Sequence, residues 1–229
     1  MKIKITVIVI ILLMSTYVTA ADKGAISSDK DKLSYSIGLD IGSKLRSQSI
    51  DVDPEIVARG LKDGFKGGDT LISEQEANEV MNAFQKKRMA EQEVIRKQLS
   101  ERNIKEGDLF LAKNKDKKGV KTTASGLQYR VLKKGKGKSP KANDSVTVNY
   151  RGTLIDGTEF DSSYKRGQPA TFNVSAVIKG WTEALQMMKE GGKWELYIPS
   201  KLGYGERGAG RLIGPNSVLI FEVELISVN

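Results

Sequence analysis

The sequence predicts an α+β protein in three parts: a helical N-terminal segment, a long connecting helix, and a C-terminal antiparallel sheet with a short helix on one face. Three observations predict this class. Apolar residues recur every four positions near the N-terminus, a charged stretch without proline runs over 73–113, and apolar and polar residues alternate from about residue 127 onward. Many strands with a single short helix favour an antiparallel sheet covered on one face.

The first 20 residues have the features of a secretory signal. A basic start with Lys2 and Lys4 precedes an apolar run over 5–14, and small residues lead to a cleavage point before Ala21. The run is too short to span the ~30 Å hydrocarbon core of a bilayer comfortably, so cleavage is favoured over a membrane anchor. We therefore expect an exported protein with a signal peptide at residues 1–20.

The sequence contains no cysteine and no histidine. Stability must then come from packing without disulfides, even after export. Serine–histidine triads, cysteine nucleophiles and ordinary zinc sites are excluded, and we expect no metal site and no cofactor.

The formal net charge is +9, with lysines concentrated in residues 113–121 and 133–141. We favour the interpretation that these runs are a solvated linker and loop. The alternative is contact with an anionic outer-membrane surface or glycan. Nucleic acid is not an expected partner of an exported chain.

Residues 21–72 are expected to form short helices. Two glycines lie inside the first helix, and each costs ~1 kcal/mol relative to alanine, so we expect another helix to approach closely there. Asp53 and Pro54 mark the start of a second helix, and Gly67 marks its end. The first helix carries an apolar stripe beside a ridge of small residues: Leu33, Ile37, Ile41 and Leu45 in the stripe, and Ser34, Gly38 and Gly42 in the ridge.

Residues 73–113 are expected to form one long helix. Ser73 and Glu76 have the spacing of a capping box at its start. At 1.5 Å per residue, roughly 40 residues span ~60 Å. Apolar positions are sparse, which favours a solvent-exposed connector between domains over a coiled coil.

After a lysine-rich link over 113–123, the remainder is expected to form strands. The turn signal Asp156-Gly157 separates two of them, and Phe172 and Val174 continue an alternating pattern. A short helix is expected near Trp181, because apolar residues there follow helical spacing. The other expected strands cover residues 127–131, 146–150, 194–198 and 219–225.

Four motifs in this region, together with Phe172, supply a set of aromatic and apolar side chains with a single acid, Asp161, among them: Tyr150, Phe160, Phe172, Val177, Ile178, Trp181, Tyr204 and Phe221. That inventory suits a dry pocket for a proline-like ring and does not suit acid–base chemistry. Over residues 123–229 the chain closely resembles the FKBP-type peptidyl-prolyl cis-trans isomerases. The motifs are YRGTLIDGTEFDSS at 150–163, VIKGW at 177–181, LGYG at 202–205 and LIF at 219–221.

The resemblance implies the FKBP fold, an antiparallel β half-barrel wrapped on a short helix, and an enzyme that rotates X-Pro peptide bonds. Rotation is opposed by ~18–20 kcal/mol because the C–N bond has partial double-bond character. No covalent bond is broken, so the enzyme must favour the twisted amide over the planar one. A dry pocket assists, because it removes the water that stabilises the charge-separated planar form.

By resemblance, Trp181 forms the pocket floor, while the Ile178 N–H and the Tyr204 hydroxyl hold substrate carbonyls. Asp161 either faces the rotating carbonyl carbon or orients Tyr150 and Arg166, in an electrostatic role. The mobile flap over 207–213 contributes Ile213. The implied walls are Tyr150, Phe160, Val177, Ile178 and Phe221.

One position is expected to be structural, and another bears on specificity. Phe172 is expected to be a core residue, because phenylalanine is so often buried. Ala170 stands where the best-known eukaryotic members often carry a bulky aromatic residue, and the flap has no histidine. Rapamycin-type macrolides are implied inhibitors, but these differences leave their affinity open.

The order of the parts resembles the macrophage infectivity potentiator (Mip) group and its periplasmic relatives. The resemblance implies a helical dimerisation domain at 21–72, a connecting helix at 73–113 and the isomerase domain at 114–229. It implies a homodimer that holds two catalytic domains apart in a V. It also implies the periplasm, outer membrane or cell surface of a Gram-negative bacterium, and a role in virulence. The candidate interface is Leu33, Ile37, Gly38, Ile41, Gly42 and Leu45.

Two functions remain open. The first is isomerisation of X-Pro bonds in exported, proline-containing polypeptides. The second is a holdase-type chaperone whose dimer cradle binds unfolded clients, with isomerisation secondary.

Overall fold

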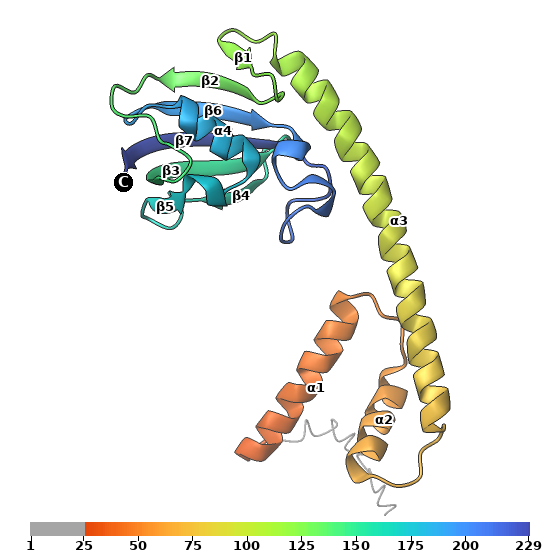
Figure 1. Ribbon diagram of the computed structural model, residues 1–229. Helices are drawn as coiled ribbons and strands as arrows, with labels where there is room; N and C mark the ends of the chain where they lie inside the picture. Colours follow the sequence, from red (N-terminus) through yellow and green to blue (C-terminus); the bar gives the residue numbers. More distant parts are fainter. Residues whose placement is uncertain (1–25) are drawn as a thin grey trace, which may run out of the picture. The chain divides into compact units, whose positions relative to one another are not determined.

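The computed structural model describes residues 26–229 (Figure 1). The chain divides into two compact units, an N-terminal unit that ends at Ala77 and a C-terminal unit over Asn78–Asn229. The predicted signal peptide at residues 1–20 lies outside the described residues. No helix within residues 26–229 combines the length and the apolar character needed to cross a bilayer.

The N-terminal unit contains the two predicted helices, α1 (Asp29–Ser47) and α2 (Pro54–Lys66). Asp53 caps α2 by accepting hydrogen bonds from the second and third N–H groups of the helix, and Pro54 occupies the first position, as predicted. Gly67 ends α2 with a φ of 69°, a conformation that favours glycine. Neither helix has a single buried residue, so their apolar side chains have no core within this unit.

Helix α3 (Glu74–Asn114) confirms the predicted long helix and has 41 residues. The Ser73 hydroxyl accepts a hydrogen bond from the Glu76 N–H, as the capping-box pattern predicted. From Asn78 onward the helix belongs to the C-terminal unit. Its two buried residues, Gly107 and Asn114, both lie toward its C-terminal end.

Seven antiparallel strands form one sheet in the order β1-β2-β6-β7-β3-β4, and β5 pairs with β3. Helix α4 (Lys179–Met187) covers one face of the sheet (Figure 1). The predicted antiparallel sheet with one short helix is therefore confirmed. The strands are β1 (Val120–Thr122), β2 (Gln128–Lys133), β3 (Ser145–Leu154), β4 (Glu159–Ser162), β5 (Ala170–Asn173), β6 (Lys193–Ile198) and β7 (Leu219–Val228).

Two local predictions were wrong. The lysine-rich link contains a strand, because Val120–Thr122 pairs with β2 in antiparallel register. The alternation expected to continue through Val174 stops at Asn173. The Asn173 side chain accepts the Ser175 N–H, which turns the chain into a short 3-10 helix and places Val174 in the core.

The core of the C-terminal unit lies between the sheet and α4. Trp181, Ala184 and Leu185 of α4 belong to one buried cluster with side chains from β3, β6 and β7. Gly180 permits this close approach, because a Cβ there would lie 2.6 Å from the Ile198 Cγ2. The core therefore fixes the position of Trp181 relative to the sheet.

Candidate functional site

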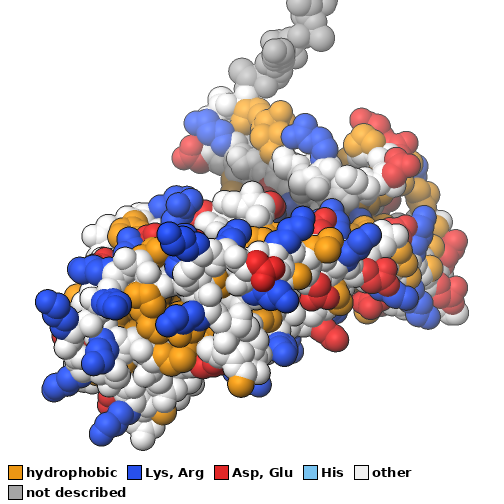
Figure 2. Space-filling view, turned by 90° about the horizontal axis from the view of Figure 1, so that it is seen from above, with side chains coloured by type: hydrophobic (Ala, Val, Ile, Leu, Met, Phe, Trp, Pro, Cys, Tyr) orange, Lys and Arg blue, Asp and Glu red, His pale blue; other side chains and the backbone are white. Residues whose placement is uncertain are grey.

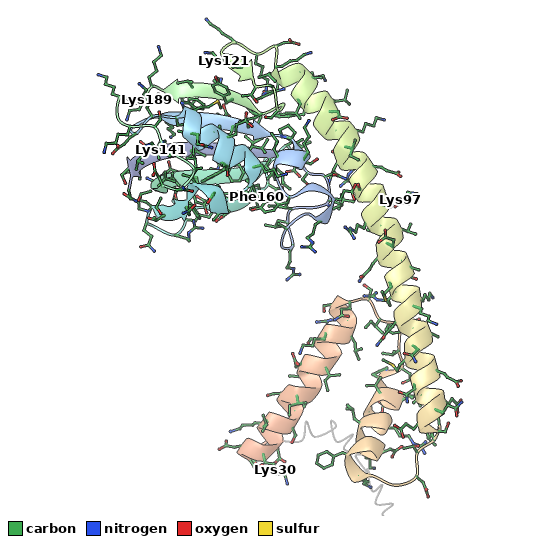
Figure 3. The ribbon with its side chains drawn as sticks, viewed as in Figure 1. Lys30, Lys97, Lys121, Lys141, Phe160 and Lys189 are labelled. Carbon is green, nitrogen blue, oxygen red and sulfur yellow. The ribbon has the colours of Figure 1, made fainter. Side chains whose placement is uncertain are left out.

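A cavity of about 600 Å³ opens on the C-terminal unit above Trp181. Strands β3, β4, β5 and β7, the start of α4 and a long loop between β6 and β7 all contribute to its lining. Phe160, labelled in Figure 3, lies toward the end of the sheet that carries this loop. The lining residues are Tyr150, Phe160, Asp161, Phe172, Ala176, Val177, Ile178, Trp181, Tyr204, Ala209, Gly210, Arg211, Leu212, Ile213 and Phe221.

Trp181 forms the floor of this cavity. Only 4 % of the residue is exposed, yet it lines the cavity, so the opening reaches the indole ring. The rings of Tyr150, Phe172 and Phe221 pack against the indole in edge-on contacts, with centroid distances of 5.2, 5.8 and 5.2 Å. The buried indole Nε1 has no hydrogen-bond partner among the described residues. An unpaired buried donor costs ~1–3 kcal/mol, so stability alone does not explain a tryptophan at this position.

Gly152 on β3 is required by the aromatic wall. A Cβ at this position would lie 2.6 Å from Phe160 and 2.7 Å from Phe221. These two rings meet edge to face over the glycine, with their centroids 5.4 Å apart. A larger residue would displace one or both rings, so the glycine sets the position of this wall.

Asp161, Tyr150 and Arg166 form one hydrogen-bonded group at the edge of the cavity. The Tyr150 hydroxyl donates to Asp161 Oδ2 at 2.5 Å, and Arg166 Nη2 donates to the Tyr150 hydroxyl at 2.7 Å. Arg166 Nη1 also donates to Asp161 Oδ1, which completes the group. Both oxygens of the carboxylate are engaged, so the geometry favours the expected role in orienting Tyr150 and Arg166.

The pKa shifts keep this group in one protonation state at neutral pH. Burial would raise the pKa of Asp161, but hydrogen bonds from Tyr150 and Arg166 outweigh it and hold the pKa below its ordinary value. Burial and the hydrogen bond to Asp161 raise the pKa of Tyr150. Burial, followed by the negative charge of Asp161, raises the pKa of Tyr204. The carboxylate is therefore ionised and both phenols stay protonated, which does not suit proton transfer near pH 7.

Two hydrogen-bond donors face the cavity without partners among the described residues. Ile178 is the N-cap residue of α4, so its N–H precedes the helical hydrogen bonds. Tyr204 lies between two 3-10 turns in the β6–β7 loop, and 40 % of the residue is exposed. These are the two groups expected from the sequence to hold substrate carbonyls.

The structure brings the predicted pocket residues together. Arg166 is not part of the lining but contacts it through Asp161 and Tyr150. The predicted residues that line the cavity are Tyr150, Phe160, Asp161, Val177, Ile178, Trp181, Tyr204, Ile213 and Phe221.

Sequence reasoning missed other parts of the wall. Phe172 was expected to be a core residue only, but it also lines the cavity, because β5 points it at Trp181. Its aromatic character among the other motifs was the available signal. Nothing in the spacing of Arg207–Ile213 identified which of its residues turn inward, and four of them besides Ile213 contribute: Ala209, Gly210, Arg211 and Leu212.

The predicted interface residues lie along α1. Leu33 and Ile37 are 63 % and 54 % exposed, while Ile41 and Leu45 are half-buried. A Cβ at Gly38 or Gly42 would meet no atom within 4 Å. The small-residue ridge is therefore open in the single chain.

Comparison with known proteins agrees with this geometry. Residues 136–226 match the family model described as "FKBP-type peptidyl-prolyl cis-trans isomerase". Residues 30–131 match the model described as "Domain amino terminal to FKBP-type peptidyl-prolyl isomerase".

Two similar proteins cover nearly the whole chain. The "Outer membrane protein MIP" of Legionella longbeachae is 48 % identical over 100 % of this chain and 98 % of its own length. The "Peptidyl-prolyl cis-trans isomerase Mip" of Coxiella burnetii is 49 % identical over 95 % of this chain and 94 % of its own length. The crystal structure of FkpA from Escherichia coli superposes with a TM-score of 0.67 at 38 % identity, covering 90 % of this chain and 99 % of that chain.

Proposed function

Because this chain belongs to the FKBP-type peptidyl-prolyl cis-trans isomerases, in the group that includes the Mip and FkpA proteins, we propose that it is an exported folding enzyme of a Gram-negative bacterium. The chain is a peptidyl-prolyl isomerase, and it acts on proline-containing polypeptides. The proposal adds that these substrates are periplasmic or surface proteins. It rests on the signal pattern at residues 1–20 and on the relatives above. A contribution to virulence, implied by the Mip resemblance, is part of the same proposal.

The cavity over Trp181 is the observation that carries the proposed mechanism. The proline ring lies on the indole, while the Ile178 N–H and the Tyr204 hydroxyl bind the flanking carbonyls. The apolar wall excludes water. Without that solvation, the planar, charge-separated form of the amide is less stable. Asp161 acts electrostatically and keeps Tyr150 and Arg166 in place. The substrate twists without any proton transfer.

A protease-coupled assay on X-Pro peptides tests this mechanism. Trp181→Leu should lower kcat/KM by at least about tenfold, since it removes the floor on which the ring is bound. Trp194→Leu is the matched control, because Trp194 is buried against Tyr129, with centroids 4.4 Å apart, and does not line the cavity. A rapamycin-type macrolide should compete with the peptide. Equal kcat/KM values for the two variants, each corrected for the folded fraction, would contradict the proposed floor.

We propose that the chain is a homodimer through the stripe on α1. The supporting observation is that this stripe and its glycine ridge are open although their residues are apolar or small. A helical segment of this size buries too little surface to be stable alone, and a second copy would supply the missing burial.

A holdase function is the second candidate, favoured by further apolar exposure in the N-terminal unit. Phe65 on α2 is 95 % exposed and Leu61 is 52 % exposed. Such side chains can bind unfolded clients. The test measures isomerisation and suppression of aggregation in parallel for Asp161→Leu. Aggregation suppression that survives the loss of turnover would support the chaperone, whereas joint loss would assign both effects to the cavity.

We also propose peripheral contact with an anionic outer-membrane surface through a lysine cluster. The cluster consists of two loops joined by hydrogen bonds, from the Lys136 N–H to the Glu190 carbonyl at 3.1 Å and from the Glu190 N–H to the Lys138 carbonyl at 2.9 Å. Lys141 and Lys189 lie at the end of the sheet away from the β6–β7 loop (Figure 3). The cluster is Lys134, Lys136, Lys138, Lys141 and Lys189, all exposed and without ion pairs inside residues 26–229.

Figure 2 shows basic side chains spread widely over the C-terminal unit, so the contact would be electrostatic. Cosedimentation with vesicles rich in phosphatidylglycerol should be strong at low salt and weak at ~1 M salt, where the Debye length is about 3 Å. Binding that ignores ionic strength would contradict the contact. A sulfated glycan that binds while vesicles do not would assign the cluster to a glycan instead.

A further inference from the structure

The β6–β7 loop over residues 203–218, called the site loop below, supplies both a donor and a wall to the cavity. Tyr204 lies near its start, and residues 209–213 line the cavity on its inner side. The loop is closed on itself by a hydrogen bond from the Asn216 N–H to the Gly205 carbonyl at 2.8 Å. Paired hydrogen bonds between Ala209 and Ile213 form its tip. On its inner side, Ile213 belongs to the buried core cluster and Ala209 packs against that cluster.

The outer side of the site loop is hydrogen-bonded to α3. Arg96 Nη2 donates to the Glu206 carbonyl at 3.0 Å, and Asn103 Nδ2 donates to the Pro215 carbonyl at 2.7 Å. Asn216 Nδ2 donates to the Ser100 hydroxyl at 2.8 Å. The three helix residues are spaced by four and three positions, so they share one face of α3. Figure 1 shows α3 passing beside this loop.

Close packing accompanies these hydrogen bonds. A Cβ on Gly214 would lie 3.0 Å from Leu99 Cδ2, and a Cβ on Gly107 would lie 2.7 Å from Val218 Cγ2. Glycine inside a helix costs ~1 kcal/mol relative to alanine. The contact with Val218 explains why α3 has a glycine at this position. The helix therefore serves as more than the solvent-exposed connector expected from its sparse apolar residues.

We propose that α3 is a positioning element of the isomerase site. Arg96, Ser100 and Asn103 fix the outer side of the site loop, and the loop then holds Tyr204 and Ile213 at the cavity. Ordering a free loop costs ~1–2 kcal/mol per residue, and the helix removes part of that cost before the substrate binds. The inference rests on the isomerase activity and adds residues of α3 that do not touch the substrate.

Kinetics of the full-length chain test this role. Asn103→Ala removes the hydrogen bonds to the Pro215 carbonyl and the Ser217 hydroxyl. It should raise KM for an X-Pro peptide about fivefold, the factor equivalent to one hydrogen bond of ~1 kcal/mol. The kcat should change less than twofold, because Tyr150 and Asp161 are untouched. Lys105→Ala is the matched control, since this exposed residue lies two positions beyond Asn103 and faces away from the loop.

A double-mutant cycle provides the second readout. Ser100→Ala and Asn216→Gly remove the two ends of one hydrogen bond, and glycine tolerates the φ of 56° at position 216. If the bond positions the loop, the effects on KM should be non-additive, with the double variant no worse than the poorer single variant.

Three results would overturn the role of α3. The first is an Asn103→Ala variant whose KM equals that of the Lys105→Ala control. The second is strict additivity in the cycle. The third is a fall in kcat that only follows the folded fraction measured by circular dichroism, with KM unchanged. The wild-type chain in the same assay reports isomerase activity by itself, so failure of this inference is distinguishable from failure of the enzyme assignment.

Discussion

The N-terminal and C-terminal units contain the same kinds of apolar residue but bury them differently. Every residue of the buried cluster belongs to the C-terminal unit. In the N-terminal unit, α1 and α2 have no buried residue at all. The C-terminal unit therefore has its own core, whereas the apolar side chains of α1 and α2 stay exposed or half-buried in the single chain. The difference teaches that the cavity depends on a core that α1 and α2 do not share, and it supports the proposal that α1 serves association.

The largest effect should come from the core. Leu196→Ala on β6, where the residue is 0 % exposed, should destabilise the C-terminal unit by about 2–5 kcal/mol, because it leaves a cavity in packed surroundings. Leu33→Ala makes the same change at a residue that is 63 % exposed and should leave that transition within about 0.5 kcal/mol. Urea unfolding followed by tryptophan fluorescence reports this transition, since Trp181 and Trp194 lie in the C-terminal unit. Equal losses of unfolding free energy in the two variants would contradict this distinction between the units.

The next effect concerns association. Ile37→Asp places a charge in the apolar stripe of α1 and should weaken dimerisation at least about a hundredfold, equivalent to ~2.8 kcal/mol. Ser36→Asp puts the same charge one position earlier, about 100° around the helix and outside the candidate interface, and should leave the dimer intact. Sedimentation equilibrium measures the dimer dissociation constant of each variant. A wild-type chain that sediments as a monomer would show that the α1 stripe is not a dimer interface. Equal weakening of dimerisation by the two variants would show the same.

The kcat/KM on a short X-Pro peptide also distinguishes the two units. Ile37→Asp should keep the kcat/KM of wild type, because α1 contributes nothing to the cavity lining. Tyr150→Phe should lower it about tenfold, since it removes the hydroxyl that joins Asp161 to Arg166, and hydrogen bonds to charged groups contribute ~1.5 kcal/mol or more. Tyr129→Phe is the control, because Tyr129 stacks on Trp194 outside the cavity. A Tyr150→Phe variant as active as this control would show that the hydroxyl is dispensable.

Sequence patterns predicted the parts of this structure that depend on local chemistry. Helix starts at Asp53 and Ser73 were predictable because capping uses side chains within three residues. The family motifs predicted the floor and most walls of the cavity. In the site loop the motifs predicted only Tyr204 and Ile213, and the contacts of this loop with α3 were not predictable, since Asn103 and Pro215 are 112 residues apart. The strand at Val120–Thr122 was missed for a similar reason, because its pairing with β2 outweighs a lysine-rich composition that favours a loop.

The smallest expected effect is that of pH on turnover. The pKa of Asp161 lies below its ordinary value of 3.8, because hydrogen bonds from Tyr150 and Arg166 outweigh burial. The pKa of Tyr150 lies above its ordinary value of 10.0, because of burial and the bond to Asp161. Neither group titrates between about pH 5 and pH 9, so kcat/KM should stay constant within about twofold there.

Stability linked to Asp161 has a definite sign. A carboxyl group whose pKa is lowered on folding contributes stability that is fully present above its unfolded pKa and is lost as pH falls through the folded value. The loss should therefore begin only below about pH 4, outside the range of the activity plateau. A chromogenic assay that needs no protease, run across pH 5–9, measures the plateau. A bell-shaped profile with a limb near pH 6–7 would indicate a proton donor or acceptor in the rate-limiting step, and it would contradict rotation driven by desolvation over Trp181.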